Sequence, residues 1–221
     1  MKKYEIDMCN GPLLKQIIIF AVPLMLSGIL QLLFNAADIV VVGRFSGSDS
    51  LAAVGATSSL INLLVNLFIG ISVGANVLFG RFCGAQDEKN ASETVHTAIC
   101  IAIYGGILMI FVGILLARPM LELMGTPENV ISLSTIYMRI YFLGMPGFMI
   151  YNFGAALLRA VGDTRRPLYF LTVAGIINVI GNLILVVGFN LGVAGVAIST
   201  TVSQYISGFF VLRCMYQDDG V

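Results

Sequence analysis

Six long apolar runs divide this sequence of 221 residues. A helix that crosses the hydrocarbon core of a bilayer needs about 20 consecutive, mostly apolar residues, and each run reaches that length. We therefore predict an all-α membrane protein with a six-helix region at 17–212, after an N-terminal segment at 1–16. The predicted transmembrane helices span about 17–42, 51–79, 95–117, 130–158, 168–189 and 191–212.

Composition supports the membrane class and argues against several other functions. Only 11% of the residues are charged, whereas soluble domains carry about 25%. The 12 basic and 12 acidic residues cancel, so no excess charge indicates a nucleic-acid partner. The sequence has no Walker lysine motif, no H-E-x-x-H and no G-x-S-x-G, and its four cysteines form no C-x-x-C pair. We expect neither an enzyme nor a bound cofactor.

Basic residues between the predicted spans set the orientation. One side of the membrane has only Arg44 and Arg118, and we therefore place the other side in the cytoplasm by the positive-inside rule. Both termini of this multi-pass cell-membrane protein are then cytoplasmic, and 213–221 begins a cytoplasmic linker. Nine basic residues lie on the predicted cytoplasmic side: Lys2, Lys3, Lys15, Arg81, Lys89, Arg159, Arg165, Arg166 and Arg213.

Polar residues recur at helical spacing inside four of the spans. In the first span they share one face, which should point to the bundle interior or to water. A single such residue is explained by a hydrogen bond between helices, worth about 0.6 kcal/mol on average. Four polar stripes together favour a shared hydrated cavity. The candidate lining residues are Ser27, Gln31, Asn35 and Asp38 in the first span, Asn62 and Asn66 in the second, Asn178 and Asn182 in the fifth, and Thr200 and Gln204 in the sixth.

Asp38 is the acidic residue well inside a predicted span, where a charge at the helix centre costs about 2.5–3.5 kcal/mol. Desolvation disfavours the ionised form, so this carboxyl can exchange a proton. Alternatively, amide oxygens of nearby Asn and Gln residues complete a shell for sodium. A structural alternative is a carboxylate that reaches the outer interface near Arg44. Pro23, one turn before the polar stripe, is a candidate bend. Arg139 near the start of the fourth span can extend to the headgroups, although a role in the cavity stays open.

Several stretches resemble the multidrug and toxic compound extrusion (MATE) family. They are "SDSLAAVGATS", "ISVGANVLFGRFCGAQD", "LLRAVGDTRRPL" and "GVAGVAISTTVSQ", together with Pro23 and Asp38 in the first span. The resemblance implies one lobe, the N-terminal one, of a twelve-helix secondary exporter that moves organic cations and drugs. It also implies that inward flow of protons or sodium drives export. By motif position, Asp38 is the coupling aspartate, Pro23 the bend and Asn178 the asparagine of the fifth helix.

The sequence departs from the family pattern in two ways. Asn182 stands where many relatives have a second acid, which leaves the coupling ion open. The six spans are half of the expected twelve, so we expect either an N-terminal lobe that lacks its C-terminal lobe or a half-transporter that pairs with a second copy. Two alternatives remain: a flippase of the same superfamily for a lipid-linked precursor, which would need basic residues in its cavity, and a membrane scaffold that transports nothing.

Overall fold

The computed structural model describes residues 12–217, which form helices and no strand. This confirms the predicted all-α class. The elements in chain order are α1 (Leu13–Phe45), α2 (Ser48–Gly84), α3 (Glu88–Leu123), α4 (Glu128–Leu143), α5 (Met145–Ala160), α6 (Arg165–Asn182), the π-helical segment η1 (Leu183–Gly188) and α7 (Gly192–Gln217).

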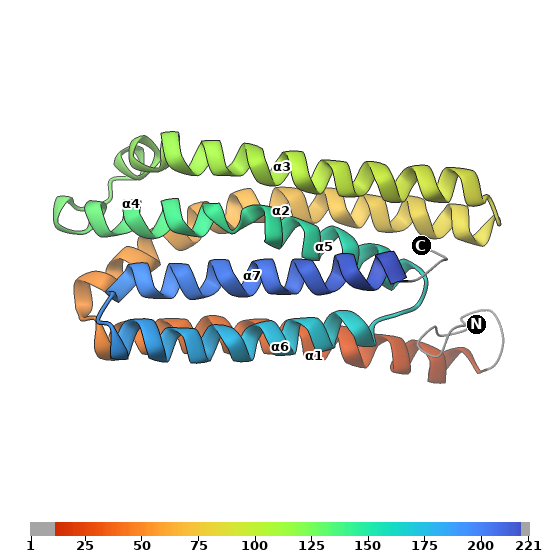
Figure 1. Cartoon of the computed structure of the whole chain (residues 1–221), viewed down its shortest axis with the longest axis horizontal. Coiled ribbons are helices and arrows are strands. Elements are labelled where there is room, and N and C mark those ends of the chain that lie inside the picture. Colours follow the sequence, from red (N-terminus) through yellow and green to blue (C-terminus); the bar gives the residue numbers. More distant parts are fainter. Residues whose placement is uncertain (1–11, 218–221) are drawn as a thin grey trace.

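The helices lie side by side along the long axis of the molecule (Figure 1). The start of α1 and the end of α7 lie at the same end of the bundle, as do the α2–α3 turn and the α5–α6 connection. This end carries most of the basic residues between the helices, including Arg81, Lys89, Arg165 and Arg166. The arrangement gives an even number of crossings from one end of the bundle to the other.

Length and composition allow five helices of residues 12–217 to cross a membrane, and the α4–α5 pair brings the number up to six. The fifth predicted span corresponds to α6 and η1 together, Arg165–Gly188. The other helices are longer than their apolar runs, because the polar residues next to these runs also form helical turns. For example, Asp87 caps α3 by accepting a hydrogen bond from the backbone N–H of Asn90.

The predicted fourth span, 130–158, is not one straight helix. It divides at Gly144 into α4 and α5, which are bent by 48° relative to each other. Pro146 explains the position of the break: it has no backbone N–H for a preceding turn, yet it fits the first turn of a new helix. A sequence pattern of apolar residues alone cannot distinguish a continuous span from a broken one.

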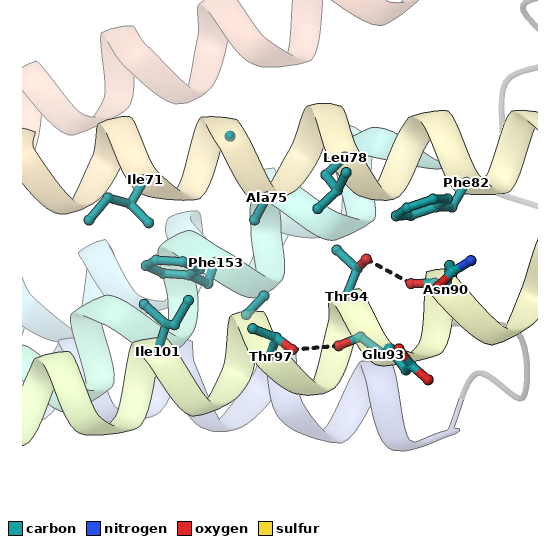
Figure 2. A pocket seen from close by; sticks show the side chains of 12 residues that line it. Ile71, Ala75, Leu78, Phe82, Asn90, Glu93, Thr94, Thr97, Ile101 and Phe153 are labelled. Atoms are coloured by element: carbon teal, nitrogen blue, oxygen red, sulfur yellow. Dashed lines mark hydrogen bonds between the residues drawn. The ribbon is translucent and has the colours of Figure 1, made fainter.

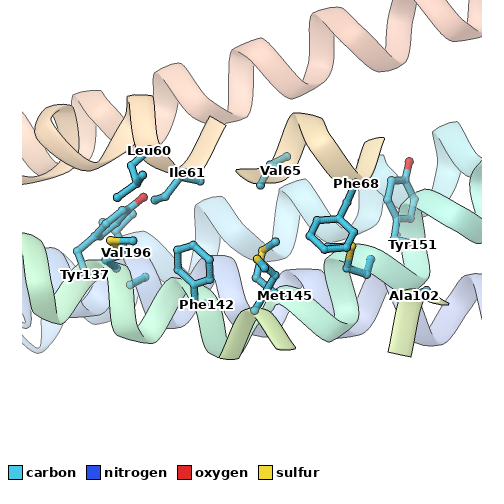
Figure 3. Close-up of a cluster of buried hydrophobic side chains, with 14 of the residues drawn as sticks. Leu60, Ile61, Val65, Phe68, Ala102, Tyr137, Phe142, Met145, Tyr151 and Val196 are labelled. Carbon is cyan, nitrogen blue, oxygen red and sulfur yellow. The ribbon is translucent and has the colours of Figure 1, made fainter. Parts of the chain in front are cut away.

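The apolar core gathers around this break (Figure 3). Phe142 and Met145, on either side of Gly144, are fully buried. α3 passes close by, because a Cβ atom on Gly106 would lie 2.5 Å from the Cα of Pro146. The α4–α5 pair therefore runs through the middle of the bundle, with α2 and α3 on one side and α7 on the other. Figure 3 labels further members of this core: Leu60, Ile61, Val65, Phe68, Ala102, Tyr137, Tyr151 and Val196.

Candidate functional site

The carboxylate of Asp38 in α1 meets two asparagines of α6. Its Oδ1 accepts a hydrogen bond from Nδ2 of Asn182 at 2.5 Å. When the amide of Asn178 is oriented to satisfy all its neighbours, its Nδ2 also donates to Oδ1 of Asp38, at 2.8 Å. The two asparagines are four residues apart and hence share one face of α6. The prediction that these three residues come together is met in the structure.

Thr200 connects the same group to α7. In that orientation of Asn178, the amide oxygen accepts a hydrogen bond from the Thr200 hydroxyl at 3.2 Å. Asn182 is fully buried, and Asn178 is 5% exposed. The site is thus a polar network at the junction of α1, α6 and α7, inside an otherwise apolar bundle.

A cavity of about 130 Å³ opens beside this network. Five helices contribute to its wall, and the wall contains one carboxylate and no Lys or Arg. Its lining residues are Gln31, Phe34, Asn35, Asp38, Tyr137, Tyr141, Phe148, Tyr151, Leu171, Ala174, Gly175, Asn178, Thr200, Ser203, Gln204 and Ser207.

Two tyrosines of α4 belong to the cavity wall but were not among the predicted site residues. Tyr137 is 7% exposed, and its ring stacks on that of Tyr141 with centroids 6.1 Å apart. Both line the cavity with Asp38. The spacing of four residues in "YMRIY" places the two rings on one helix face. That spacing was the available signal, but aromatic side chains within a predicted span are equally typical of apolar packing.

Two buried acceptor atoms at this site have no hydrogen-bond partner within residues 12–217. They are Oδ1 of Asn182 in the network and Oε1 of Gln204 in the cavity wall. A buried polar atom without a partner costs about 1–3 kcal/mol. Such oxygens can accept a hydrogen bond from a protonated carboxyl group or from water, and they can also ligate a hard cation such as sodium.

Asn62 and Asn66 are the main correction to the predicted cavity lining. Both side chains are exposed on α2 and lie outside the cavity that Asp38 lines. The reason is the phase of the helix: α2 turns Ile61, Val65 and Phe68 towards the core. Asn62 and Asn66 consequently form a polar stripe on the outer face of α2.

Pro23 and Ser27 are buried in α1 but also lie outside the cavity wall. The hydroxyl of Ser27 donates to the carbonyl of Pro23 at 2.8 Å, so its hydrogen bond is local. The helix continues through Pro23 without ending. Arg139 is exposed on α4 and does not line the cavity. Asp38 faces α6 rather than Arg44, which is exposed at the end of α1.

Comparison with known proteins identifies relatives of this lobe. Residues 23–184 match the family model described as MatE. The chain is 36% identical over 198 residues to "Probable multidrug resistance protein YoeA" of Bacillus subtilis, covering 88% of this chain and 42% of the relative. It is 30% identical to "Probable multidrug resistance protein YpnP" of the same organism, covering 96% and 47% respectively. The "Multidrug export protein MepA" of Staphylococcus aureus is 26% identical over 217 residues.

Solved structures agree with the fold. An outward-facing multidrug resistance MATE family transporter superposes with a TM-score of 0.90 at 24% identity, covering 98% of this chain and 48% of that chain. An inward-facing one gives a TM-score of 0.79 at 22% identity, covering 90% and 46%. The chain therefore spans about half the length of the proteins it matches, which fits one lobe. The match to the family model, the 36% identity and the six-crossing bundle agree in assigning this chain to the MATE family of transport proteins.

Proposed function

We propose that this chain is one lobe of an ion-coupled secondary exporter of organic cations and drugs, with the coupling ion bound at Asp38. The observation that carries the proposal is the pair of hydrogen bonds from Asn178 and Asn182 to one carboxylate oxygen beside a cavity. Relatives of the chain are named as multidrug resistance and export proteins, which supports the substrate class. The coupling ion is a proton or sodium.

The chemistry begins with the charge of Asp38. As an anion, the carboxylate is a strong acceptor, and hydrogen bonds to a charged group contribute about 1.5–3 kcal/mol each. These bonds hold α1 to α6. When a proton or a sodium ion binds, it neutralises the carboxylate and weakens its attraction for the two amide N–H groups. Oδ1 of Asn182, which lacks a partner among the described residues, can accept a hydrogen bond from the protonated carboxyl once the amide turns over.

Neutralisation would then change the shape of α1. Pro23 provides no N–H for the carbonyl of Ile19, so the helix has a weak point about four turns before Asp38. Released from α6, α1 bends at Pro23 and reshapes the cavity, and the bound cationic substrate leaves to the outside. Ion and substrate must lower each other's affinity by the same factor.

We further propose that a second six-helix lobe completes the transporter, either a C-terminal lobe on the same polypeptide or a second copy of this chain. The relatives are about twice as long as the chain. In addition, α1 exposes large apolar side chains such as Met25 (66%) and Leu32 (70%), and α2 exposes the amides of Asn62 and Asn66. We place these α2 amides on the substrate path between the lobes.

The intact mass of the native gene product tests the completing lobe. A mass near twice 23.7 kDa would support a C-terminal lobe on the same polypeptide. A chain of 23.7 kDa that cross-links into dimers would support a second copy. A chain of that mass that remains monomeric in its own membrane would contradict both forms of the proposal. We also propose that this lobe lies in the cell membrane, with the basic end of the bundle, where α1 begins and α7 ends, facing the cytoplasm.

The rival functions make different demands on the cavity. A flippase for a lipid-linked precursor must hold phosphate groups, whereas the cavity wall has no Lys or Arg and Arg139 is outside it. A scaffold would use its polar residues only for packing. In that case, Asn182 and Gln204 would not carry buried oxygen atoms without partners among the described residues.

The decisive experiment is export of a cationic dye from cells that express the native protein or its Asp38→Asn variant. Losing the charge-assisted hydrogen bonds of the coupling site should lower coupled export by about tenfold or more. The matched control is Asp49→Asn, which removes an exposed carboxylate in the first turn of α2. Imposed pH and sodium gradients identify the ion, since only the driving ion should accelerate export. An Asp38→Asn protein that exports at the wild-type rate refutes the assignment.

A further inference from the structure

A second cavity, larger than the one at Asp38, lies between α2 and α3 (Figure 2). Its volume is about 450 Å³. Ligand pockets in proteins hold roughly 300–1,000 Å³, so this groove is large enough for a ligand. No residue of its wall belongs to the Asp38 cavity. The lining residues are Ile71, Gly74, Ala75, Leu78, Phe82, Asn90, Glu93, Thr94, Thr97, Ala98, Ile101 and Phe153.

The walls of this α2–α3 groove are largely apolar and open to the outside of the bundle. Figure 2 shows Ile71, Leu78 and Phe82 along the α2 side, Ile101 on the α3 side and Phe153 of α5 between them. Ile71 is 41% exposed and Leu78 45%. The groove is therefore an elongated apolar cleft on the bundle surface, reachable from the side rather than through the interior.

Gly74 keeps the groove open. A Cβ atom at this position would have no atom within 4 Å, so the missing side chain leaves space instead of permitting close helix packing. The same holds for Gly70 one turn earlier, which is exposed but does not line the groove. Although the two glycines have the small-xxx-small spacing of packed helices, neither packs against a neighbour in the described chain.

Polar groups gather at the end of the groove where α3 begins. The hydroxyls of Thr94 and Thr97 donate to carbonyls of their own helix, each at 2.7 Å, and are therefore satisfied. Glu93 lines the groove, and its carboxylate forms no ion pair within residues 12–217. Two exposed basic residues stand next to this end: Arg81, which precedes Phe82 in α2, and Lys89, one turn before Glu93 in α3.

We propose that the α2–α3 groove binds a zwitterionic bilayer phospholipid with an ammonium headgroup, such as phosphatidylethanolamine. One acyl chain occupies the cleft against Phe153, the ammonium group pairs with Glu93, and the phosphate lies between Arg81 and Lys89. Both signs of charge beside one apolar cleft match this headgroup better than a simple organic cation, which would need only the carboxylate. An acyl chain in the cleft covers the apolar side chains of its walls, which are otherwise exposed.

The first test fills the groove. The native protein is purified, and its lipid adducts are counted by native mass spectrometry after incubation with phosphatidylethanolamine. Gly74→Leu should lower the bound fraction by about tenfold, which corresponds to about 1.4 kcal/mol. Gly70→Leu, on the same helix and with the same open surroundings, should leave it unchanged. Equal binding by the two variants would overturn the proposal.

The second test concerns the headgroup and uses an exposed position whose substitution does not threaten folding. Glu93→Gln should abolish the preference for phosphatidylethanolamine over phosphatidylglycerol, whereas Glu88→Gln, five residues earlier and outside the groove wall, should retain it. Dodecyltrimethylammonium serves as the alternative occupant. The lipid assignment is wrong if Gly74→Leu weakens binding of this cation but does not weaken binding of phosphatidylethanolamine. The groove would then take an organic cation.

Discussion

Tyr205 in α7 donates its hydroxyl hydrogen to the backbone carbonyl oxygen of Leu143, 2.7 Å away, at the end of α4. One turn earlier, the hydroxyl of Thr201 donates to the carbonyl of Ile140 at 2.9 Å. The last carbonyls of a helix have no partner within it. Side chains of α7 thus replace the hydrogen bonds that the break at Gly144 removes from the middle of the bundle.

Tyr205→Phe should therefore destabilise the protein without changing its packing. The lost hydrogen bond should lower the free energy of unfolding by about 1 kcal/mol. Unfolding in mild detergent measures the change. Tyr104→Phe is the control, because Tyr104 is 72% exposed on α3 and its hydroxyl has no hydrogen-bond partner within residues 12–217. Equal stability of the two variants would contradict the role of Tyr205.

Gly147→Ala should be more damaging, because α5 and α7 touch at this position. An added Cβ atom would lie 2.8 Å from backbone atoms of both Gln204 and Tyr205. Forced repacking of a filled core costs about 1–3 kcal/mol, and the midpoint of thermal unfolding should fall accordingly. Gly55→Ala places its Cβ where no atom lies within 4 Å, so this control should retain wild-type stability or gain slightly.

Asp163 in the α5–α6 connection is the most consequential carboxylate outside the candidate site. It is fully buried, forms an ion pair with Arg166, and accepts hydrogen bonds from the backbone N–H groups of Arg165 and Arg166 at 3.1 Å. Asp163→Ala leaves a mostly buried guanidinium without that partner and should lower the free energy of unfolding by about 3 kcal/mol.

The exposed pair Arg118–Glu122 provides the matched comparison. Its atoms are 2.9 Å apart, but the side chains are 65% and 54% exposed. Glu122→Ala should consequently change stability by less than about 1 kcal/mol in the same assay. A similar loss in the free energy of unfolding for the two substitutions would show that burial does not make the Asp163–Arg166 pair more stabilising than the exposed pair.

Asn182→Ala should impair coupling rather than folding. It removes the amide that donates to Asp38, and the weaker stabilisation of the carboxylate should reduce ion-coupled dye export by about tenfold. Asn129→Ala removes an exposed amide in the first turn of α4, outside the cavity wall, and should leave the dependence on the ion gradient unchanged. The dependence of export rate on the imposed gradient distinguishes the two variants. If Asn182→Ala retains the wild-type dependence, the amide is structural.

Asp87, in the turn before α3, offers a pH-dependent test at a surface site. Hydrogen bonds from the side chain and the backbone N–H of Asn90 hold its pKa below the usual 3.8. Because the folded pKa is depressed, the cap stabilises the folded state above that pH, and this contribution is lost as the pH falls through the folded pKa. In Asn90→Ala the pKa should rise towards 3.8, as measured by carboxyl ¹³C chemical shifts. An unchanged pKa would exclude the side-chain bond as its cause.

Apolar length predicted well which helices are long and apolar enough to cross a membrane, because a bilayer imposes the same demand on every helix. Several of the polar residues predicted in the first, fifth and sixth spans lie together, since Gln31, Asp38, Asn178 and Thr200 all line one cavity, whereas Ser27 lies outside it. The helices of these spans carry few polar residues, and those side chains point into the bundle because lipid cannot form hydrogen bonds with them.

Features that depend on the phase of a helix were harder to predict. Asn62 and Asn66 follow the same spacing rule as the true lining residues, yet α2 buries its opposite, apolar face. Tyr137 and Tyr141 escaped prediction because an aromatic ring fits either a cavity wall or a packed core. The bend at Gly144 depends on contacts with α3 and α7, which lie far away in the sequence.

The six π-helical residues of η1 follow Asn182 directly. A π-helix closes its hydrogen bonds over five residues, whereas an α-helix uses four, so it acts as an insertion of one residue. Because the wider turn holds the extra residue, deleting one residue from 183–188 would restore α-helical winding and leave the residues that follow on the same helix faces, without moving Asn178 or Asn182. The segment can thus lose one residue while the helix end beyond η1 and the amides at Asp38 keep their orientations relative to each other.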